Sequence, residues 1–457
     1  MRHLLAAAFV LAGLAGPAAA TAAAGWSEPA TVPGSERGAF PSVASSEHGT
    51  VVLNSGLSRV TVVPRTADGF GPAREAGPGD PFEQVLGTAL AANGDTTVIS
   101  ERKRPRFIRR VRVTLTSASG SRLGPMTISD RAHSAQSPVL SVAPDGTTVA
   151  AWWGYAPGEG WTPQAAVRLP GEPRFAMRQQ LASQGRAGRL TGYDMPRAVL
   201  RAAAANGGRA AVAWGFTSTS TSSTSSIGVA AASGGRFSPS GSFSSPTQDM
   251  SELDLSLSND GQLLVDYIQG SGYRSGARST LMAASARIDR KLPEFAAVAT
   301  GDTSGCTCRL LSAFTEDGRA TIGWTPRANA NPYGGPLLVV TRQADGTFSP
   351  AETLAPDTDS VDWVDVQPGP DGSTAISWRS RLQTGAGEVD TQRLALRPRG
   401  SSSFEAPVEL PSTASFGLPS VASLTFTSAG DALAVWSTDS APGVLGPARY
   451  SVLSPQR

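Results

Sequence analysis

A short pattern of polar and hydrophobic residues recurs along the whole chain. A polar turn that ends in glycine is followed by small or β-prone residues and then by a large aromatic residue, as in "PDGTTVAAW" (144–152). The sixth residue after this glycine is aromatic in six of eight units. The pattern therefore predicts a repeated structural unit. The glycines lie 45 to 62 residues apart, at Gly49, Gly94, Gly146, Gly208, Gly261, Gly318, Gly372 and Gly430.

The residues on either side of each glycine predict a β-hairpin. Apolar and polar residues alternate before the turn, most clearly in "LDLSLS" (253–258), and Asp or Asn before the glycine suits a tight turn. The stretch after the turn is typical of a strand buried on both faces. Two further strands follow, as in "PLLVVTRQ" (336–343) and "GTFSPAETL" (346–354). Four short strands in a repeat of about fifty residues predict one blade of a β-propeller.

We therefore predict one all-β propeller domain over residues 25–457, with eight four-stranded blades; seven blades and an irregular segment are the alternative. The last unit stops after its third strand, "ARYSVLS" (448–454). The segment "GWSEPATVP" (25–33) has the aromatic-x-x-proline spacing of "SSFEAPVEL" (402–410), the fourth strand of the seventh unit. We expect it to complete the last blade, because closing the ring removes exposed sheet edges. An unstructured tail is the alternative.

Residues 1–24 are typical of a signal peptide. Arg2 and His3 precede the apolar run "LLAAAFVLAGLAG" (4–16), and small residues follow it. The run is shorter than the roughly 20 residues of a spanning helix, so cleavage is favoured over a retained anchor. We expect a secreted protein with no membrane span after cleavage. Its net charge of +2 gives no general attraction to nucleic acid.

The units "PDGTTVAAW" and "GTFSPAETL" resemble those of secreted actinobacterial β-propeller repeat proteins, over essentially the whole mature chain. Such propellers are similar in architecture to sialidase-like and tryptophan-aspartate propellers. The resemblance implies the fold and export, and it carries no enzymatic activity across. The chain departs from the sialidase Asp-box, Ser-x-Asp-x-Gly-x-x-Trp, in spacing, and no arginine triad or acid–nucleophile pair is identified in it.

The residue types present restrict the chemistry. Only His48 and His133 remain after signal removal, which argues against a multi-histidine zinc site or a Ser-His-Asp triad. We predict no cofactor, no metal and no catalytic residue. Cys306 and Cys308 lie in "SGCTCRL", where a structural disulfide is expected in an exported protein; free thiols and a redox or metal role are the alternatives.

The densest charge lies between the second and third strands of the second unit, in "ERKRPRFIRRVR" (101–112). We call this segment the basic hairpin. Propellers often bind ligands on the face that carries such connections, so its guanidinium groups predict a site for phosphate, sulfate or carboxylate. A solvated hairpin without a ligand is the alternative. The basic residues are Arg102, Lys103, Arg104, Arg106, Arg109, Arg110 and Arg112.

Two further groups are candidate ligand residues. In "WWGYAPGEGW" (152–161), Trp153, Tyr155 and Trp161 are candidates for a sugar-stacking platform, with aromatic packing as the alternative. Arg201, Asp254 and Asp365 each lie seven residues before a hairpin glycine. We expect them near the mouth of the central channel, where they would bind a cation or a polyol or perform acid–base chemistry, or simply form a hydrated wall.

These features favour an exported binding or scaffold propeller of unknown ligand. The candidate partners are an anionic glycan, a cell-wall polymer or a protein. The alternative is a glycan-acting hydrolase or lyase that uses the carboxylates at the channel mouth.

Overall fold

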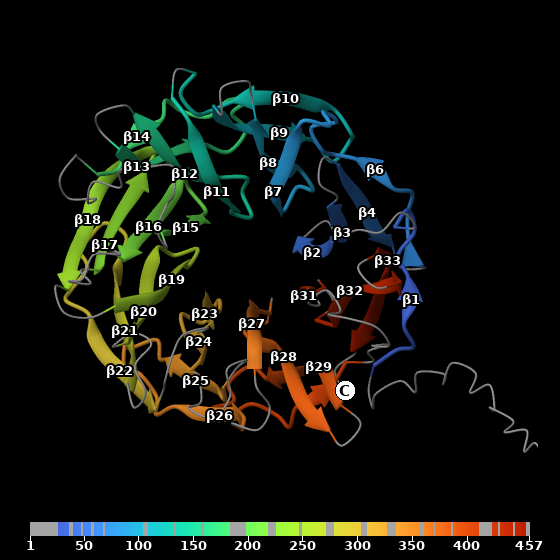
Figure 1. Cartoon of the computed structure of the whole chain (residues 1–457), viewed down its shortest axis with the longest axis vertical. Coiled ribbons are helices and arrows are strands. Elements are labelled where there is room, and N and C mark those ends of the chain that lie inside the picture. Colours follow the sequence, from blue (N-terminus) through green and yellow to red (C-terminus); the bar gives the residue numbers. More distant parts are fainter. Residues whose placement is uncertain are drawn as a thin grey trace, which may run out of the picture.

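The protein is a ring of sheets around a central axis (Figure 1). The regular elements of the described residues are all β-strands, and none of these residues forms a helix long and apolar enough to cross a membrane. The computed structural model describes residues 26–35, 40–46, 49–55, 59–66, 69–103, 108–131, 133–156, 160–182, 198–217, 225–245, 249–270, 278–302, 309–326, 335–356, 361–369, 371–384, 387–410, 423–427, 430–441 and 444–453.

Eight antiparallel sheets follow one another along the chain, and each is one blade. Blade 1 contains β2 (Phe40–Ser46), β3 (Gly49–Ser55), β4 (Val60–Thr66), β5 (Gly69–Phe70) and β6 (Arg74–Glu75). Blade 2 contains β7 (Glu83–Leu90), β8 (Thr96–Lys103), β9 (Arg109–Thr116) and β10 (Arg122–Thr127). Blade 3 contains β11 (Ala135–Val142), β12 (Thr148–Ala156), β13 (Gly160–Arg168) and β14 (Gln179–Gln180). Blade 4 contains β15 (Ala198–Ala205), β16 (Arg209–Thr217), β17 (Ser225–Ser233) and β18 (Arg236–Ser245).

The second half of the ring repeats this order. Blade 5 contains β19 (Asp249–Leu257), β20 (Gln262–Gly270), β21 (Arg278–Arg287) and β22 (Ala296–Asp302). Blade 6 contains β23 (Arg309–Phe314), β24 (Ala320–Thr325), β25 (Leu337–Arg342) and β26 (Glu352–Ala355). Blade 7 contains β27 (Val361–Pro368), β28 (Thr374–Thr384), β29 (Gly387–Arg397) and β30 (Val408–Glu409). Blade 8 contains β31 (Ser423–Phe426), β32 (Ala432–Ala441), β33 (Val444–Leu453) and, from the start of the chain, β1 (Ala30–Thr31).

The predicted eight-bladed ring and its closure by an N-terminal strand are both confirmed. Strand β1 pairs antiparallel with β33, so that Ala30 lies opposite Tyr450. The N–H of Ser27 donates to the carbonyl of Val452 at 2.8 Å, and that of Val32 donates to the carbonyl of Ala448 at 2.9 Å. The first and last described segments of the domain thus form one sheet.

The hydrophobic core is divided among the junctions between blades. One cluster of buried residues lies at each of the eight junctions, including the one between blades 8 and 1. The repeated aromatic of the second strand belongs to these clusters and packs against the preceding blade, as Trp324 of blade 6 does against Leu264 and Leu281 of blade 5. This explains the fixed register of the aromatic in the sequence, because the neighbouring blade supplies its packing surface.

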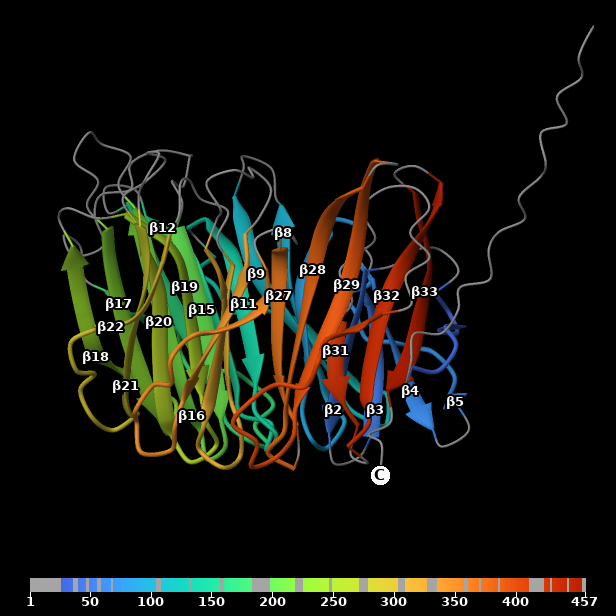
Figure 2. The ribbon, with the colours of Figure 1, turned by 90° about the horizontal axis from the view of Figure 1, so that it is seen from below.

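The hairpin glycines make the tight turn that the sequence predicts. Gly146 has φ 89° and Gly261 has φ 92°, in the left-handed region where a side chain would be strained. The Asp145 carboxylate accepts a hydrogen bond from the N–H of Thr147 at 2.8 Å and stabilises the same turn. Figure 2 shows that the inner strands run between the two faces of the ring, and that β8 ends at the upper face.

Candidate functional site

The basic hairpin extends from the ends of β8 and β9. The pairing register places Lys103 opposite Arg109 and Arg102 opposite Arg110. Like charges at opposed positions of two strands repel, so the hairpin requires compensation from other residues or from a ligand. Arg104 and Arg106 lie outside the described residues.

Three acidic residues supply part of that compensation. Arg102 lies 3.1 Å from Asp80, Arg109 lies 3.3 Å from Glu101, and Arg112 forms an ion pair with Glu83. Of these three, only Glu101 lies within the basic hairpin; Asp80 and Glu83 lie about twenty residues earlier in the sequence and come close only through the fold. Lys103 is exposed and has no acidic partner among the described residues.

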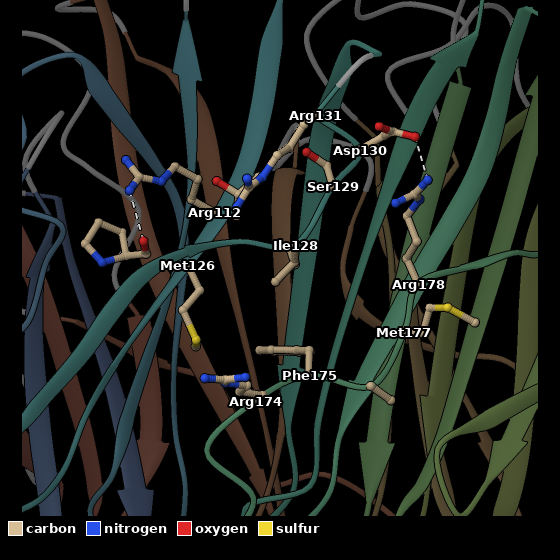
Figure 3. A pocket seen from close by; sticks show the side chains of 13 residues that line it. Arg112, Met126, Ile128, Ser129, Asp130, Arg131, Arg174, Phe175, Met177 and Arg178 are labelled. Carbon is tan, nitrogen blue, oxygen red and sulfur yellow. Dashed lines mark hydrogen bonds and ion pairs between the residues drawn. The ribbon is translucent and has the colours of Figure 1, made fainter.

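Arg112 also borders a pocket of about 880 Å³ between blades 2 and 3, which we call the rim groove. One wall is formed by residues 125–131, which include the end of β10, and the other by residues 174–178, between β13 and β14. Figure 3 shows Met126, Ile128 and Phe175 in the middle of this groove. Ile128 and Phe175 are partly buried against the core cluster of the blade 2–3 junction, so the apolar floor is anchored in the fold.

The arginines of the rim groove differ in their pairing. Arg178 is held by Asp130 at 2.5 Å, and His133 Nδ1 lies 3.4 Å from the same carboxylate. Arg131 and Arg174 are exposed, and no acidic side chain among the described residues pairs with either guanidinium. Figure 3 places them at opposite ends of the groove, with Ile128 between them. The groove therefore combines an apolar floor with two uncompensated positive charges.

The predicted aromatic platform is part of the core. Trp153 has an exposed fraction of 0 % and Trp161 of 5 %, and both belong to the cluster between blades 3 and 4. Tyr155 is partly buried against that cluster, and its ring centroid lies 5.2 Å from that of Trp161. Packing, the alternative reading of these residues, is what the structure supports, because sugar stacking needs an exposed ring face.

Arg201 and Asp254, two of the three residues predicted to converge on the inner strands, are in contact. Arg201 Nε of β15 lies 3.4 Å from Asp254 Oδ1 of β19, and Arg201 also lies 3.9 Å from Glu252. Asp254 has an exposed fraction of only 4 %. Its other oxygen accepts the backbone N–H of Ser312, from β23, at 2.6 Å. One buried carboxylate thus links blades 4, 5 and 6.

A second carboxyl group, Asp266 of β20, lies directly across the strand pair from Asp254 and is fully buried. The Ser312 hydroxyl lies 3.0 Å from an oxygen of each carboxyl group. A hydroxyl has one proton to donate, so both contacts are hydrogen bonds only if one carboxyl is itself protonated. Asp254 has the Arg201 charge beside it, so the proton belongs on Asp266.

Electrostatics agree with this assignment. Burial raises the pKa of Asp254, and the neighbouring Arg201 and the Ser312 hydrogen bonds oppose that rise. Burial raises the pKa of Asp266 well above its usual value, and the negative charge of Asp254 raises it further. Oδ2 of Asp266 is buried without a hydrogen-bond partner in the described structure, which a neutral acid tolerates better than a carboxylate does. The blade 5–6 junction therefore contains a neutral acid beside an ion pair.

Asp365, the third predicted residue, lies on β27 of blade 7, two blades away from Asp254. The side-chain amide of Gln367 donates to both of its carboxylate oxygens, at 3.0 and 3.2 Å. Burial nevertheless raises the pKa of Asp365 to about 6. In the described structure it is thus a separate carboxylate with its own partner, outside the Arg201–Asp254 cluster.

These shifts predict how stability varies with pH. Asp266 has a higher pKa in the folded than in the unfolded protein, so its contribution is fully present below about pH 4 and is lost as the pH rises through the folded pKa. Each unit of the shift amounts to about 1.4 kcal/mol. We expect Asp266→Asn, a neutral mimic, to reduce the loss of Tm between pH 4 and 8. The part of this loss of Tm that Asp365 causes, with its pKa of about 6, should remain in the variant.

The control is Asp289→Asn in the same blade, because the Asp289 side chain is 67 % exposed. We expect it to leave the pH profile of Tm unchanged. The same slope in the wild type and in Asp266→Asn would show that Asp266 ionises with an ordinary pKa.

Sequence reasoning missed Asp266, Ser312, Arg131 and Arg174. A detectable signal existed for Asp266, which is the one charged residue in the apolar strand "LLVDYI" (263–268). The two arginines on either side of apolar residues in "RFAMR" (174–178) were a weaker signal for the rim groove. Cys306 and Cys308 lie outside the described residues. In the described part of the chain, no group of three or more His, Cys, Asp or Glu residues is placed to hold a metal ion.

The sequence matches no protein-family model and no curated protein. Among solved structures, the chain is similar to the BP39L lectin from Burkholderia pseudomallei, with 12 % identity over 82 % of this chain and 99 % of the lectin and a TM-score of 0.47. It is also similar to prolyl oligopeptidase B from Galerina marginata, with 10 % identity over 88 % of this chain and 56 % of the oligopeptidase and a TM-score of 0.46.

A third similar structure is a Hadza microbial sialidase, with 11 % identity over 73 % of this chain and 71 % of the sialidase and a TM-score of 0.38. Likenesses at this level give no indication of ligand or activity. The propeller assignment rests on the strand order and the pairing registers described above.

Proposed function

We propose that this protein is an exported, non-catalytic binding propeller whose ligand is an anionic glycan or cell-wall polymer. The observation that carries the proposal is an excess of cations on blades 2 and 3, which we call the cationic sector. Arginine forks in such a sector suit carboxylate and sulfate groups. Its described cations are Arg102, Lys103, Arg109, Arg110, Arg112, Arg131, Arg174 and Arg178, and the acidic residues that lie among them are Asp80, Glu83, Glu101 and Asp130.

Export is proposed from the signal-peptide pattern of residues 1–24. The propeller fold suits a scaffold of this kind, because blades from distant parts of the chain present their loops and edges on one rigid ring. The cationic sector uses two such blades.

The glycan-acting enzyme is less well supported than binding. Asp254 is buried, is paired with Arg201 and accepts two hydrogen bonds from Ser312. A carboxylate that attacks or protonates a sugar has to reach it, and Asp254 would have to give up these partners first. The contacts of Asp254 with Arg201 and Ser312 instead indicate that its charge stabilises the packing of blades 4, 5 and 6.

Binding of heparin, as a probe for sulfated glycans, tests the proposal. We expect the mature protein to bind heparin with an affinity that falls steeply with salt, through screening and counterion release. Replacing Arg104, Arg106 and Arg109 with Ser should weaken binding by about tenfold or more and flatten the salt dependence, since each charged contact contributes to both. Isothermal titration at several salt concentrations measures both effects.

The matched control removes three exposed arginines from other blades: Arg236, Arg290 and Arg399. The net charge then changes by the same amount, so a loss confined to the first variant assigns binding to the basic hairpin. Equal losses in the two variants would indicate attraction by net charge alone. Heparin affinity that is unchanged by the hairpin substitutions and by high salt contradicts the proposal.

A further inference from the structure

The rim groove has the dimensions of a small-molecule site. Its volume of about 880 Å³ lies within the range of about 300 to 1,000 Å³ that is typical of ligand pockets. Both walls are fixed to the blades. Ser129 accepts the N–H of Val111 of β9 at 3.0 Å, and the N–H of Ala176 donates to the carbonyl of Val167 of β13 at 2.8 Å.

The floor of the groove is apolar and adaptable. Figure 3 shows Met126 and Phe175 in the middle of the groove, and Met177 at the edge is 85 % exposed. Methionine side chains adjust their shape to the surface that they contact, and an exposed methionine beside a phenylalanine favours an apolar partner. A sulfated polysaccharide, with hydroxyl groups on most ring positions, would leave this floor without a matching surface.

The charges of the groove select an anion. The Asp130–Arg178 pair is internally compensated, and the remaining cations, Arg131 and Arg174, have no acidic partner among the described residues. Arg112 at the border is already bound to Glu83 and to the carbonyl of Pro125. An anionic ligand would therefore meet two open guanidinium groups with an apolar surface between them (Figure 3).

We propose that the rim groove binds a small amphipathic anion, a molecule with a sulfonate, carboxylate or phosphate group on an aromatic or acyl body. The apolar body lies on Met126, Ile128 and Phe175, and the anionic group pairs with Arg131 or Arg174. The site belongs to the same cationic sector as the proposed polymer-binding function and deepens it, since it adds a ligand class that the basic hairpin alone would not hold.

The probe is 1-anilinonaphthalene-8-sulfonate, whose fluorescence rises when its rings leave water. We expect saturable, one-site binding to the folded mature protein. Arg131→Gln and Arg174→Gln should each raise the Kd by about tenfold, the effect of one charge-assisted contact, and Met126→Ser should raise it several-fold. The uncharged analogue N-phenyl-1-naphthylamine should bind the wild type at least tenfold more weakly than the sulfonate does.

The control substitution is Arg399→Gln, an exposed arginine that follows β29 of blade 7, across the ring from blades 2 and 3 (Figure 1), which should leave the Kd unchanged. Unaltered melting curves show that the variants are folded. The proposal is overturned if the folded wild type does not bind the sulfonate, if neither groove arginine affects the Kd, or if the neutral analogue binds equally well.

The basic-hairpin variant separates this site from the polymer site. Replacement of Arg104, Arg106 and Arg109 with Ser should abolish most heparin binding and leave the Kd of the sulfonate within about twofold of the wild type, because Arg109, the one of the three that the structure describes, is not among the described residues that line the groove. Heparin binding that is lost in the groove variants and retained in the hairpin variant would make the groove the polymer site and overturn its assignment to a small amphipathic anion. Sulfonate binding that is lost in the hairpin variant alone would overturn the assignment to the groove.

Discussion

Removal of residues 25–34 is expected to lower the free energy of unfolding by about 5 kcal/mol and the Tm by about 5 °C for a chain of this length. Trp26 and Val32, with exposed fractions of 4 % and 0 %, would leave holes on both sides of blade 8. Trp26 packs with the cluster between blades 7 and 8, and Val32 with the cluster between blades 8 and 1. The deletion therefore weakens the two junctions that close the ring.

Hydrogen bonds add to this effect. Ser27 Oγ accepts the N–H of Val452 at 3.0 Å, and the Ser451 hydroxyl donates to the carbonyl of Ser27 at 2.6 Å. Without the segment, the β33 edge is also open to another chain. Thermal unfolding and gel filtration measure the two consequences. Glu28→Ala, an exposed change in the same segment, is the control and should alter the Tm by less than about 1 °C. An unchanged Tm after the deletion contradicts closure by this segment.

The sequence was most informative where the same physical requirement recurs in every blade. Each second strand is buried between two neighbouring sheets, so its composition and its aromatic residue repeat, and Gly146 and Gly261 occupy equivalent left-handed turns. Blade number and ring closure follow from such repeats. The ends of the outer strands cannot be predicted from the repeats. Strands β14 and β30 have only two residues each, and surface loops tolerate variation in length.

The candidate sites depend on contacts that occur once and link distant positions. Arg201 and Asp254 were expected to converge because they share a register position, and they do. Asp266 and Ser312 occupy other registers, so their place beside Asp254 follows only from the packing of three blades. The rim groove is built by two connecting segments, whose conformations no repeat determines.

Blade 2 shows how a departure from the repeat creates a polar site. Ser100 stands where most blades have an aromatic residue, and its hydroxyl donates to Glu83 at 2.7 Å. Glu83 in turn holds Arg112 at the border of the rim groove. The smaller side chain thus leaves room for a buried acid, and the acid positions a guanidinium group. An absent aromatic in a repeat is therefore itself a signal of local function or of a polar junction.

Arginines at the ends of third strands form a second repeated feature of the blades. Arg168 of blade 3 donates to the carbonyl of its own hairpin glycine, Gly146, at 3.0 Å, and Arg342 of blade 6 lies 5.8 Å from the ring centroid of Phe314. Arg397 of blade 7 is the most buried, with an exposed fraction of 1 %. Burial lowers the pKa of Arg397 to about 10, which keeps it charged at neutral pH.

Arg397→Ala is expected to lower the free energy of unfolding by about 3 to 5 kcal/mol. The guanidinium group donates to the hydroxyls of Thr341 at 2.6 Å, Thr321 at 2.7 Å and Thr374 at 3.0 Å, and lies 5.2 Å from the ring centroid of Phe404. Two of these threonines belong to blade 6 and one to blade 7, so alanine leaves a cavity and unpaired hydroxyls at the junction.

Arg397→Lys distinguishes the effect of the positive charge on stability from the effect of the planar guanidinium group. Lysine keeps the cation but has no planar fork to reach threonines on two blades, so we expect it to recover less than half of the lost stability. Arg399→Ala, two residues along the chain and exposed, should alter the free energy of unfolding by less than about 0.5 kcal/mol. Urea unfolding of the four proteins measures these differences. If Arg397→Ala stays within about 1 kcal/mol of the wild type, the threonine hydroxyls have found other partners and the arginine does not hold blades 6 and 7 together.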